Sequence, residues 1–203
     1  MKISRLIAVP AALGLALVSQ MAMAKGPSWT YAEIGYVHFD ADKYDGNGAG
    51  INLSYDAMKN IFVKLGYSRL FIDATGVSSD IDADRFEIGM GGHMSLTDNI
   101  DAFGSASYVD IEYSGGIPTE ADEGYLVELG VRGMVSKKVE LNAKAAYQHL
   151  AYTNFLDISD DDDYGFEVGT VIKLKKKFHF TGNISYFDET EETGAFAGIR
   201  LNF

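Results

Sequence analysis

Charged residues recur at alternate positions inside segments that are otherwise apolar, and this spacing carries the main chemical signal of the chain. Twelve of them fall opposite the apolar face of their segments, and six are acidic and six basic. These residues are Glu33, Lys64, Arg85, Glu87, Asp101, Glu128, Arg132, Glu140, Lys144, Glu167, Lys173 and Arg200. Charges that are removed from bulk water need partners of opposite sign, so the balance predicts a paired network in a packed lumen. The alternative is a narrow conduit lined by both signs.

The four histidines are the candidates for acid–base chemistry. His38 and His149 share the parity of the apolar residues, whereas His93 and His179 share the parity of the charged residues. The chain contains no Gly-x-Ser-x-Gly elbow and no cysteine that could act as a nucleophile. We therefore interpret His38 and His149 as interfacial residues and expect no enzymatic activity. Catalytic groups on a lipid-facing site that act on lipid A are the alternative.

Four consecutive aspartates form a candidate metal site: Asp160, Asp161, Asp162 and Asp163. Carboxylate oxygens are the ligands that Ca²⁺ and Mg²⁺ prefer, but the run lacks the spacing and the bidentate glutamate of an EF-hand. We expect weak binding of Ca²⁺ or Mg²⁺ at most, with a solvated acidic loop as the alternative. No other cofactor is expected.

Ten segments keep a period of two in their apolar residues, which is the pattern of half-buried β-strands. They are Trp29–His38, Gly48–Tyr55, Ile61–Leu70, Arg85–Met94, Ile100–Val109, Tyr125–Met134, Val139–Leu150, Phe166–Leu174, Phe178–Phe187 and Gly194–Phe203. Each is about ten residues long, the length that a tilted strand needs to cross a bilayer. Ten strands turned apolar-side-in would enclose more space than their side chains fill. The sequence therefore predicts an all-β fold, a transmembrane antiparallel up-and-down β-barrel of ten strands, with eight strands as the alternative.

The connections between these segments alternate in length. The short ones are Asp56–Asn60, Ser95–Asn99, Val135–Lys138 and Lys175–Lys177. The long ones are Asp40–Asn47, Asp73–Asp84, Asp110–Gly124, Ala151–Tyr164 and Asp188–Thr193, which together hold 21 of the 29 acidic residues. Short periplasmic turns and long external loops are typical of outer-membrane barrels, so we expect an acidic external rim.

A tyrosine recurs on the apolar face near the long-loop end of every second segment. The five residues are Tyr36, Tyr67, Tyr108, Tyr147 and Tyr186. Tyrosine places an apolar ring against hydrocarbon and a hydroxyl among headgroups, so this series predicts an aromatic belt at a membrane interface.

The amino terminus has the features of a secretory signal peptide. Lys2 and Arg5 precede an apolar stretch, and Ala22-Met23-Ala24 supplies a small-residue cleavage site. We expect residues 1–24 to be cleaved and residues 25–203 to form one barrel domain in the outer membrane, with both ends periplasmic. The net charge of −12 argues against nucleic acid as a partner.

The closing segment resembles the last strand of bacterial outer-membrane β-barrels, because one face is apolar, the other is small or polar, and Phe203 follows. In that family the terminal phenylalanine is the signal read by the assembly machinery, and the resemblance implies this role for Phe203. The whole pattern resembles the small outer-membrane barrels that include the OmpA transmembrane domain and OmpX/Ail. Those relatives have eight strands, so their functions do not transfer.

Three functions follow as expectations, in this order. The first is a monomeric structural or cell-surface barrel with a closed lumen, whose partners are outer-membrane lipid, lipopolysaccharide and the barrel-assembly machinery. The second is a narrow channel for small solutes, and the third is an enzyme that acts on lipid A.

Overall fold

The computed structural model describes residues 26–41, 44–74, 81–115, 120–151 and 162–203. The predicted signal peptide lies outside the described residues. Ten strands make up the fold: β1 (Tyr31–Asp40), β2 (Tyr44–Met58), β3 (Ile61–Ala74), β4 (Ile81–Thr97), β5 (Ile100–Gly115), β6 (Glu120–Met134), β7 (Val139–Ala151), β8 (Asp162–Lys173), β9 (Phe178–Phe187) and β10 (Thr193–Asn202).

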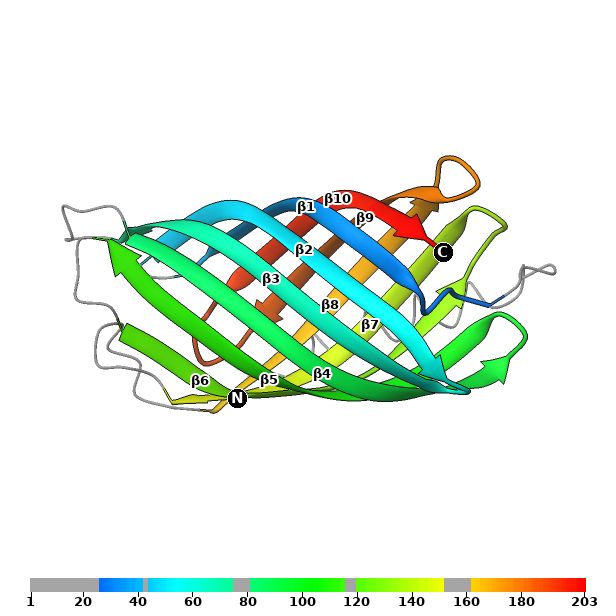
Figure 1. The fold of residues 1–203 in the computed structure, drawn as a ribbon, viewed down its shortest axis with the longest axis horizontal. Coiled ribbons are helices and arrows are strands. Elements are labelled where there is room, and N and C mark those ends of the chain that lie inside the picture. Colours follow the sequence, from blue (N-terminus) through cyan, green and yellow to red (C-terminus); the bar gives the residue numbers. More distant parts are fainter. Residues whose placement is uncertain (1–25, 42–43, 75–80, 116–119, 152–161) are drawn as a thin grey trace, which may run out of the picture.

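Every strand is antiparallel to its sequence neighbour, and β1 also pairs with β10 to close the barrel. The seam runs from Tyr31 opposite Asn202 to Asp40 opposite Thr193 without a bulge. The tilted strands wrap around one long axis, as Figure 1 shows. The predicted up-and-down barrel is thus confirmed, with ten strands and not eight.

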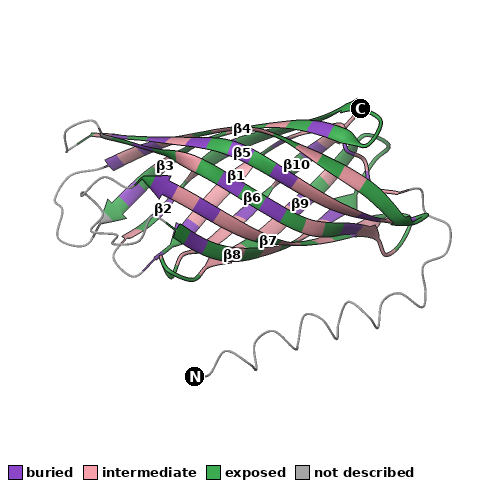
Figure 2. Ribbon diagram, turned by 90° about the horizontal axis from the view of Figure 1, so that it is seen from below, coloured by how far each residue is buried: buried purple, intermediate pink, exposed green. Residues whose placement is uncertain are grey.

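The outer surface of the barrel is strongly apolar. Ile34, Leu129 and Ile184 are 60%, 66% and 58% exposed, and each points outward beside apolar neighbours. Residues along each strand alternate between exposed and buried, which Figure 2 displays as bands of colour. This alternation is the period-two pattern of a wall with two different faces. In the described residues no helix is long and apolar enough to cross a membrane.

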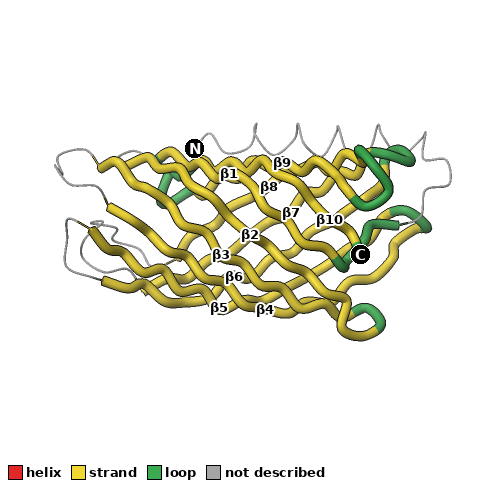
Figure 3. Tube along the Cα trace, turned by 45° about the horizontal axis from the view of Figure 1, so that its top comes forward, coloured by secondary structure: helices red, strands yellow, loops and turns green. Residues whose placement is uncertain are grey.

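The strands β3 to β6 are longer than a bilayer requires. They contain 14, 17, 16 and 15 residues, whereas β1, β9 and β10 contain 10 each, and a spanning strand needs about 9–11. Their extra length lies at the long-loop end (Figure 1). The predicted loops 73–84 and 110–124 were therefore too long, because β4 already begins at Ile81 and β5 continues to Gly115. Figure 3 shows this end opposite the short connecting turns.

Both faces of β4 and β5 change polarity just above the level of the tyrosines. On β4 the outward residues below this level are apolar, ending at Phe86, and Asp84 and Asp82 follow above it. The inward residues change in the opposite sense, from Glu87 and Arg85 to Ala83 and Ile81, which are 2% and 1% exposed. We call the strand residues 69–73, 81–84, 109–115 and 121–124 the collar.

Candidate functional site

The lumen is the candidate site because most of the predicted charged residues point into it. The side chains inside it form three layers along the barrel axis. We call them the mouth layer, at the short-turn end, the charged layer, at mid-height, and the apolar cluster, at the long-loop end.

The mouth layer is built around Trp29, the only tryptophan of the chain, which is 6% exposed. Its ring stacks on His93 and Phe62, with centroid distances of 4.5 and 4.7 Å. Its indole Nε1 donates a hydrogen bond of 2.8 Å to the Asp101 carboxylate. Trp29 was predicted to begin the first strand, but β1 begins at Tyr31 and Trp29 lies just before it, inside the lumen.

Two glycines make room for this aromatic stack. A Cβ atom added at Gly91 would lie 2.5 Å from the ring of Phe62, and one at Gly130 would lie 2.8 Å from the ring of Phe103. Phe103 packs edge-on against Trp29 at 5.5 Å. The glycine-rich inner face of β4 and β6 thus lets aromatic rings lie flat against the wall.

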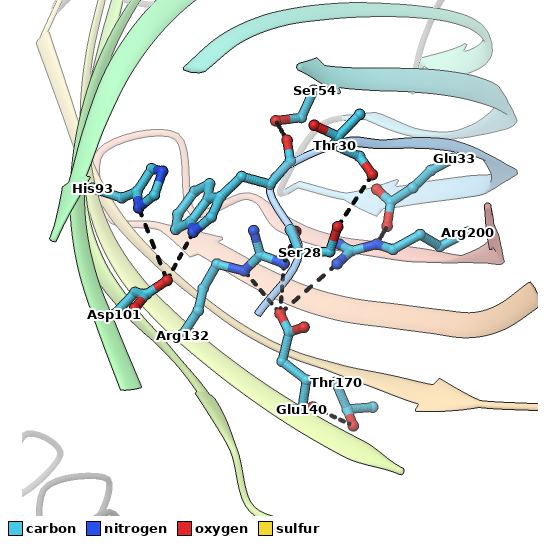
Figure 4. A network of polar contacts seen from close by, with 11 residues as sticks. Ser28, Thr30, Glu33, Ser54, His93, Asp101, Arg132, Glu140, Thr170 and Arg200 are labelled. Carbon is cyan, nitrogen blue, oxygen red and sulfur yellow. Dashed lines mark hydrogen bonds and ion pairs between the residues drawn. The ribbon is translucent and has the colours of Figure 1, made fainter. Parts of the chain in front are cut away.

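Two arginines complete the mouth layer, and Figure 4 shows their carboxylate partners. Arg132 Nη2 lies 2.7 Å from Glu140 Oε1, and its guanidinium carbon lies 4.4 Å above the Trp29 ring. Arg200 Nε donates a 2.6 Å hydrogen bond to Glu33 and lies 3.8 Å, through Nη1, from the same Glu140 oxygen. All four charged groups are less than 10% exposed, so each depends on its partner.

The charged layer is centred on Glu128, which is 4% exposed. Lys64 from β3 and Lys144 from β7 both contact its carboxylate, the latter at 2.6 Å, and Ser105 donates a hydrogen bond of 2.9 Å. Lys64 also lies 2.7 Å from Glu87, and Lys144 lies 3.2 Å from Glu167. This layer ties together the six strands from β3 to β8.

Two members of the predicted network behave differently. Arg85 donates a 3.2 Å hydrogen bond to Gln148 and, within the described residues, makes no ion pair. Lys173 lies outside the network altogether. It ends β8 at the short-turn edge, where its side chain is exposed. The period-two alternation assigns Lys173 to the inward face. Because β8 ends at this residue, however, its side chain lies beyond the end of the barrel wall.

The apolar cluster was not predicted. Nine buried residues form it: Phe39, Ile72, Ile81, Ala83, Val109, Ile111, Tyr113, Leu126 and Leu150. Val109 is 0% and Leu150 is 1% exposed. The signal was present in the sequence, because the period-two alternation of inward apolar residues continues past Val109 into a segment that was assigned to a loop.

The connection between β9 and β10 is fastened to the inner wall by Asp163. This carboxylate, 1% exposed, accepts hydrogen bonds from the backbone N–H of Glu189 at 3.0 Å and from the Thr190 hydroxyl at 2.7 Å. Burial raises the pKa of Glu192 in the same connection, and the charge of Arg85 opposes this effect.

The predicted metal site has no support in the described part of the run. Asp162 faces outward and accepts hydrogen bonds from Tyr147 and His149, whereas Asp163 faces inward. Adjacent strand residues point to opposite faces, so these two carboxylates do not converge on one ion. Asp160 and Asp161 lie outside the described residues. No group of three potential metal ligands occurs within the described ranges.

A cavity of about 410 Å³ remains inside the lumen. It extends from Trp29 past Lys64 and Arg85 to Leu150, and Asn183 and other polar residues of β9 line one side. The three layers therefore do not fill the barrel completely.

The five belt tyrosines all lie on the outer face. Tyr67 is opposite Phe86, Tyr108 is opposite Tyr125, and Tyr147 is opposite Tyr164 in the strand register. Three hydroxyls donate to carboxylates just above: Tyr67 to Asp84, Tyr108 to Glu123 and Tyr147 to Asp162. Tyr36 is 54% exposed, and Tyr186 packs against Phe166 at 5.9 Å.

The histidines provide no complete catalytic set. His149 Nδ1 lies 2.7 Å from Asp162, but no serine, threonine or cysteine in the described chain is hydrogen-bonded to it. His38 Nδ1 lies 3.1 Å from the backbone oxygen of Gly46. His93 belongs to the mouth layer.

Phe203, the predicted assembly signal, is 68% exposed, and its backbone N–H donates to the Thr30 oxygen.

Several solved barrels have a similar fold. The NanC porin has a TM-score of 0.54 at 5% identity over 85% of this chain and 100% of that chain. The outer-membrane protease OmpT from Escherichia coli has a TM-score of 0.51 at 10% identity over 91% of this chain and 100% of that chain. The translocator domain of the autotransporter NalP from Neisseria meningitidis has a TM-score of 0.50 at 11% identity, with 97% of each chain covered. At these identities the likeness extends to the fold alone.

No curated protein matches the sequence. The family model for the outer membrane protein beta-barrel domain, however, matches residues 10–203, which includes every strand of the barrel. With its closed antiparallel wall and apolar outer surface, the chain belongs to the outer membrane protein β-barrel domain family.

Proposed function

We propose that the protein is a structural and surface-presenting barrel of the outer membrane whose lumen does not conduct. In this proposal the collar projects from the cell surface, and the short turns face the periplasm. The observation that carries it is the succession of three layers across the lumen. An ion on the axis would have to pass the Trp29–Arg132 stack, the Lys64–Glu128 pair and the apolar cluster.

Each layer opposes passage for a separate physical reason. Displacing the mouth layer would separate buried ion pairs, which costs about 3–5 kcal/mol when one partner is lost. Apart from the Tyr113 hydroxyl, the apolar cluster offers no group that could replace the hydration shell of an ion. In this proposal a solute meets a barrier of different chemistry at each end and at mid-height.

The outer face of the collar supports the surface role. It presents Asp82, Asp84, Asp110, Glu112 and Glu123 around the rim, with Arg69 paired to Asp82 at 2.6 Å. Such an excess of one sign attracts cationic partners and repels the phosphates of neighbouring lipopolysaccharide unless divalent cations intervene. A cationic surface ligand, or cation-bridged lipopolysaccharide, fits this rim.

Liposome swelling tests the closed lumen. Proteoliposomes of the full mature chain are diluted into isotonic solutions of sugars of increasing size, with a general porin as the positive control. The proposal expects the swelling rate of protein-free liposomes for every sugar. Swelling that slows with increasing sugar size would refute it.

A narrow channel is the second candidate, and the lumenal cavity of about 410 Å³ favours it. Arg85 would be its selectivity residue, because it is the lumenal cation without an ion pair among the described residues. If the lumen conducts, Arg85→Gln should shift ion selectivity toward cations, whereas Arg69→Gln on the outer face should not.

A role in lipid A chemistry ranks third. The contact that favours it is the pair of His149 and Asp162 on the lipid-facing side. Mass analysis of lipid A from cells that produce the parent protein or His149→Gln would reveal any modification that depends on this imidazole.

A further inference from the structure

Lysines gather on one side of the barrel at the short-turn end. Six of the 17 basic residues of the chain lie there: Lys137, Lys138, Lys173, Lys175, Lys176 and Lys177. We call this group the lysine edge. The two turns that carry it are neighbours, because β7 and β8 pair and the backbone N–H of Lys173 donates to the Lys138 oxygen at 2.7 Å. Lys173 is the last residue of β8, and the other five lysines lie in the two turns.

The lysine edge has no acidic residue exposed beside it in the two turns. The nearest carboxylate along the chain, Glu140, is 4% exposed and already pairs with Arg132. The other two short turns differ, because they contain Asp56 and Asp98 with a single lysine, Lys59. The positive charge is therefore confined to the side formed by β6 to β9, in a protein whose net charge is −12.

Large apolar side chains flank the lysine edge on the outer face. Leu174 and Phe178 are 59% and 53% exposed, and Ile172 and Phe180 continue the same stripe at 37% and 38%. The turn is closed by the hydrogen bond from Leu174 N–H to the Phe178 oxygen at 3.0 Å. The exposed Lys175, Lys176 and Lys177 thus project from the point where the apolar surface ends.

We propose that the lysine edge binds anionic phospholipid of the adjacent leaflet. The ammonium groups contact the phosphodiester of the headgroup, and the acyl chains lie along Leu174 and Phe178. Basic residues at the membrane surface attract anionic lipids in this way, and the attraction falls off within a Debye length. The apolar stripe directly below the lysines favours a lipid over a soluble acidic protein.

The assignment to the periplasmic leaflet rests on the orientation in the proposed function. The binding itself depends only on the barrel being in a bilayer. A conducting lumen would overturn the proposed function and leave the lysine edge unaffected, so the two can fail separately.

Native mass spectrometry tests the proposal. The full mature chain is reconstituted in nanodiscs of mixed phosphatidylethanolamine and phosphatidylglycerol. The protein is then released from the nanodiscs in the mass spectrometer, and the lipids that stay bound to it are counted. We expect phosphatidylglycerol to be enriched about fivefold over its share of the mixture. Raising the salt concentration before release should reduce the enrichment, because these charges are exposed.

Two double variants with the same change of charge provide the comparison. Lys175→Gln with Lys176→Gln should bring the enrichment close to the composition of the mixture. Lys59→Gln with Arg69→Gln neutralises two exposed cations elsewhere and should leave it unchanged. Folding of each variant is checked by its heat-modifiable mobility on gels. Equal retention of both lipids by the parent protein, or equal losses in the two double variants, would overturn the proposal.

Discussion

The wall of the barrel and its collar follow opposite rules along the same strands. In the wall, outward residues such as Ile88 are apolar and inward residues such as Glu128 are charged. In the collar, outward residues such as Asp82 are charged and inward residues such as Val109 are apolar. The reversal occurs just above the tyrosines, within one or two residues on β4 and β5.

The difference shows how the surroundings determine the stabilising interaction. Because hydrocarbon surrounds the wall, burying apolar side chains inside it gains little free energy. The wall lumen is therefore stabilised by paired charges and hydrogen bonds. Water around the collar restores that gain, at about 25 cal/mol per Å² of apolar surface buried. The collar is therefore packed like the core of a soluble protein, and its apolar cluster lies above the charged layer.

The largest expected effect tests the wall. Glu128→Ala removes the carboxylate that Lys64 and Lys144 share, leaving two buried ammonium groups short of a partner. The free energy of unfolding should fall by about 3–5 kcal/mol. Urea titration of the barrel in lipid vesicles measures it. Glu123→Ala, on the outer face of the same strand, is the matched control and should have little effect. Similar losses in both variants would contradict the distinction between the two faces.

The next effect tests the collar side of the comparison. Leu150→Ala opens a void in the apolar cluster, where this side chain is 1% exposed, and should lower the unfolding free energy by about 2–4 kcal/mol. Leu129→Ala, at a position 66% exposed toward lipid, should have a smaller effect, because lipid can fill the vacated space. The same urea titration compares them. If the lipid-facing substitution proves the more costly, the cluster does not behave as a core.

A smaller effect concerns the mouth layer. Trp29→Phe keeps an aromatic ring but loses the hydrogen bond to Asp101, whose 4% exposed carboxylate retains Ser95 as a donor. A loss of about 1.5–3 kcal/mol is expected, as for other bonds to a charged group. Ile111→Val in the apolar cluster, which removes one methylene, should lose about 0.5–1.5 kcal/mol. The reverse order would show that the mouth layer is held by packing and not by its polar contacts.

The smallest effect is a pH dependence of the connection between β9 and β10. The pKa of Glu192 is raised in the folded state by burial, so the folded protein holds this proton more tightly than the unfolded chain. The stabilising contribution is complete below the ordinary glutamate pKa and is lost as the pH rises through the raised value. Residues 188–192 should thus open less often at mildly acidic pH than at neutral pH. Hydrogen exchange, corrected for its intrinsic rate, measures this difference, and Glu192→Gln should abolish it.

Much of this architecture was predictable because side chains alternate strictly across a strand. The alternation of Ile34 with Glu33 and of Leu129 with Glu128 was enough to predict the wall and its two faces. The apolar cluster was missed for a different reason. The segments around Ile81 and Ile111 are rich in aspartate and glutamate on their outer face, and such charges are typical of loops. Their inward residues keep the strand period and would have extended β4 and β5.

The partners within the lumen could not be predicted from alternation. Lys64 and Glu128 are 64 positions apart on strands that are not neighbours, so their contact depends on the register and tilt of the whole barrel. Trp29 and Asp101 meet across 72 positions, because the segment before β1 turns into the mouth. Parity shows that such side chains face inward, but not at which height they meet.

Ion conductance in planar bilayers tests the central claim most directly, namely that the layers close the lumen. We expect the parent barrel to insert without steady open channels. Arg85→Gln should behave in the same way, because it removes none of the layers. Steady openings of the parent barrel, with an ion selectivity that changes in Arg85→Gln, would show that the lumen conducts and would contradict this account.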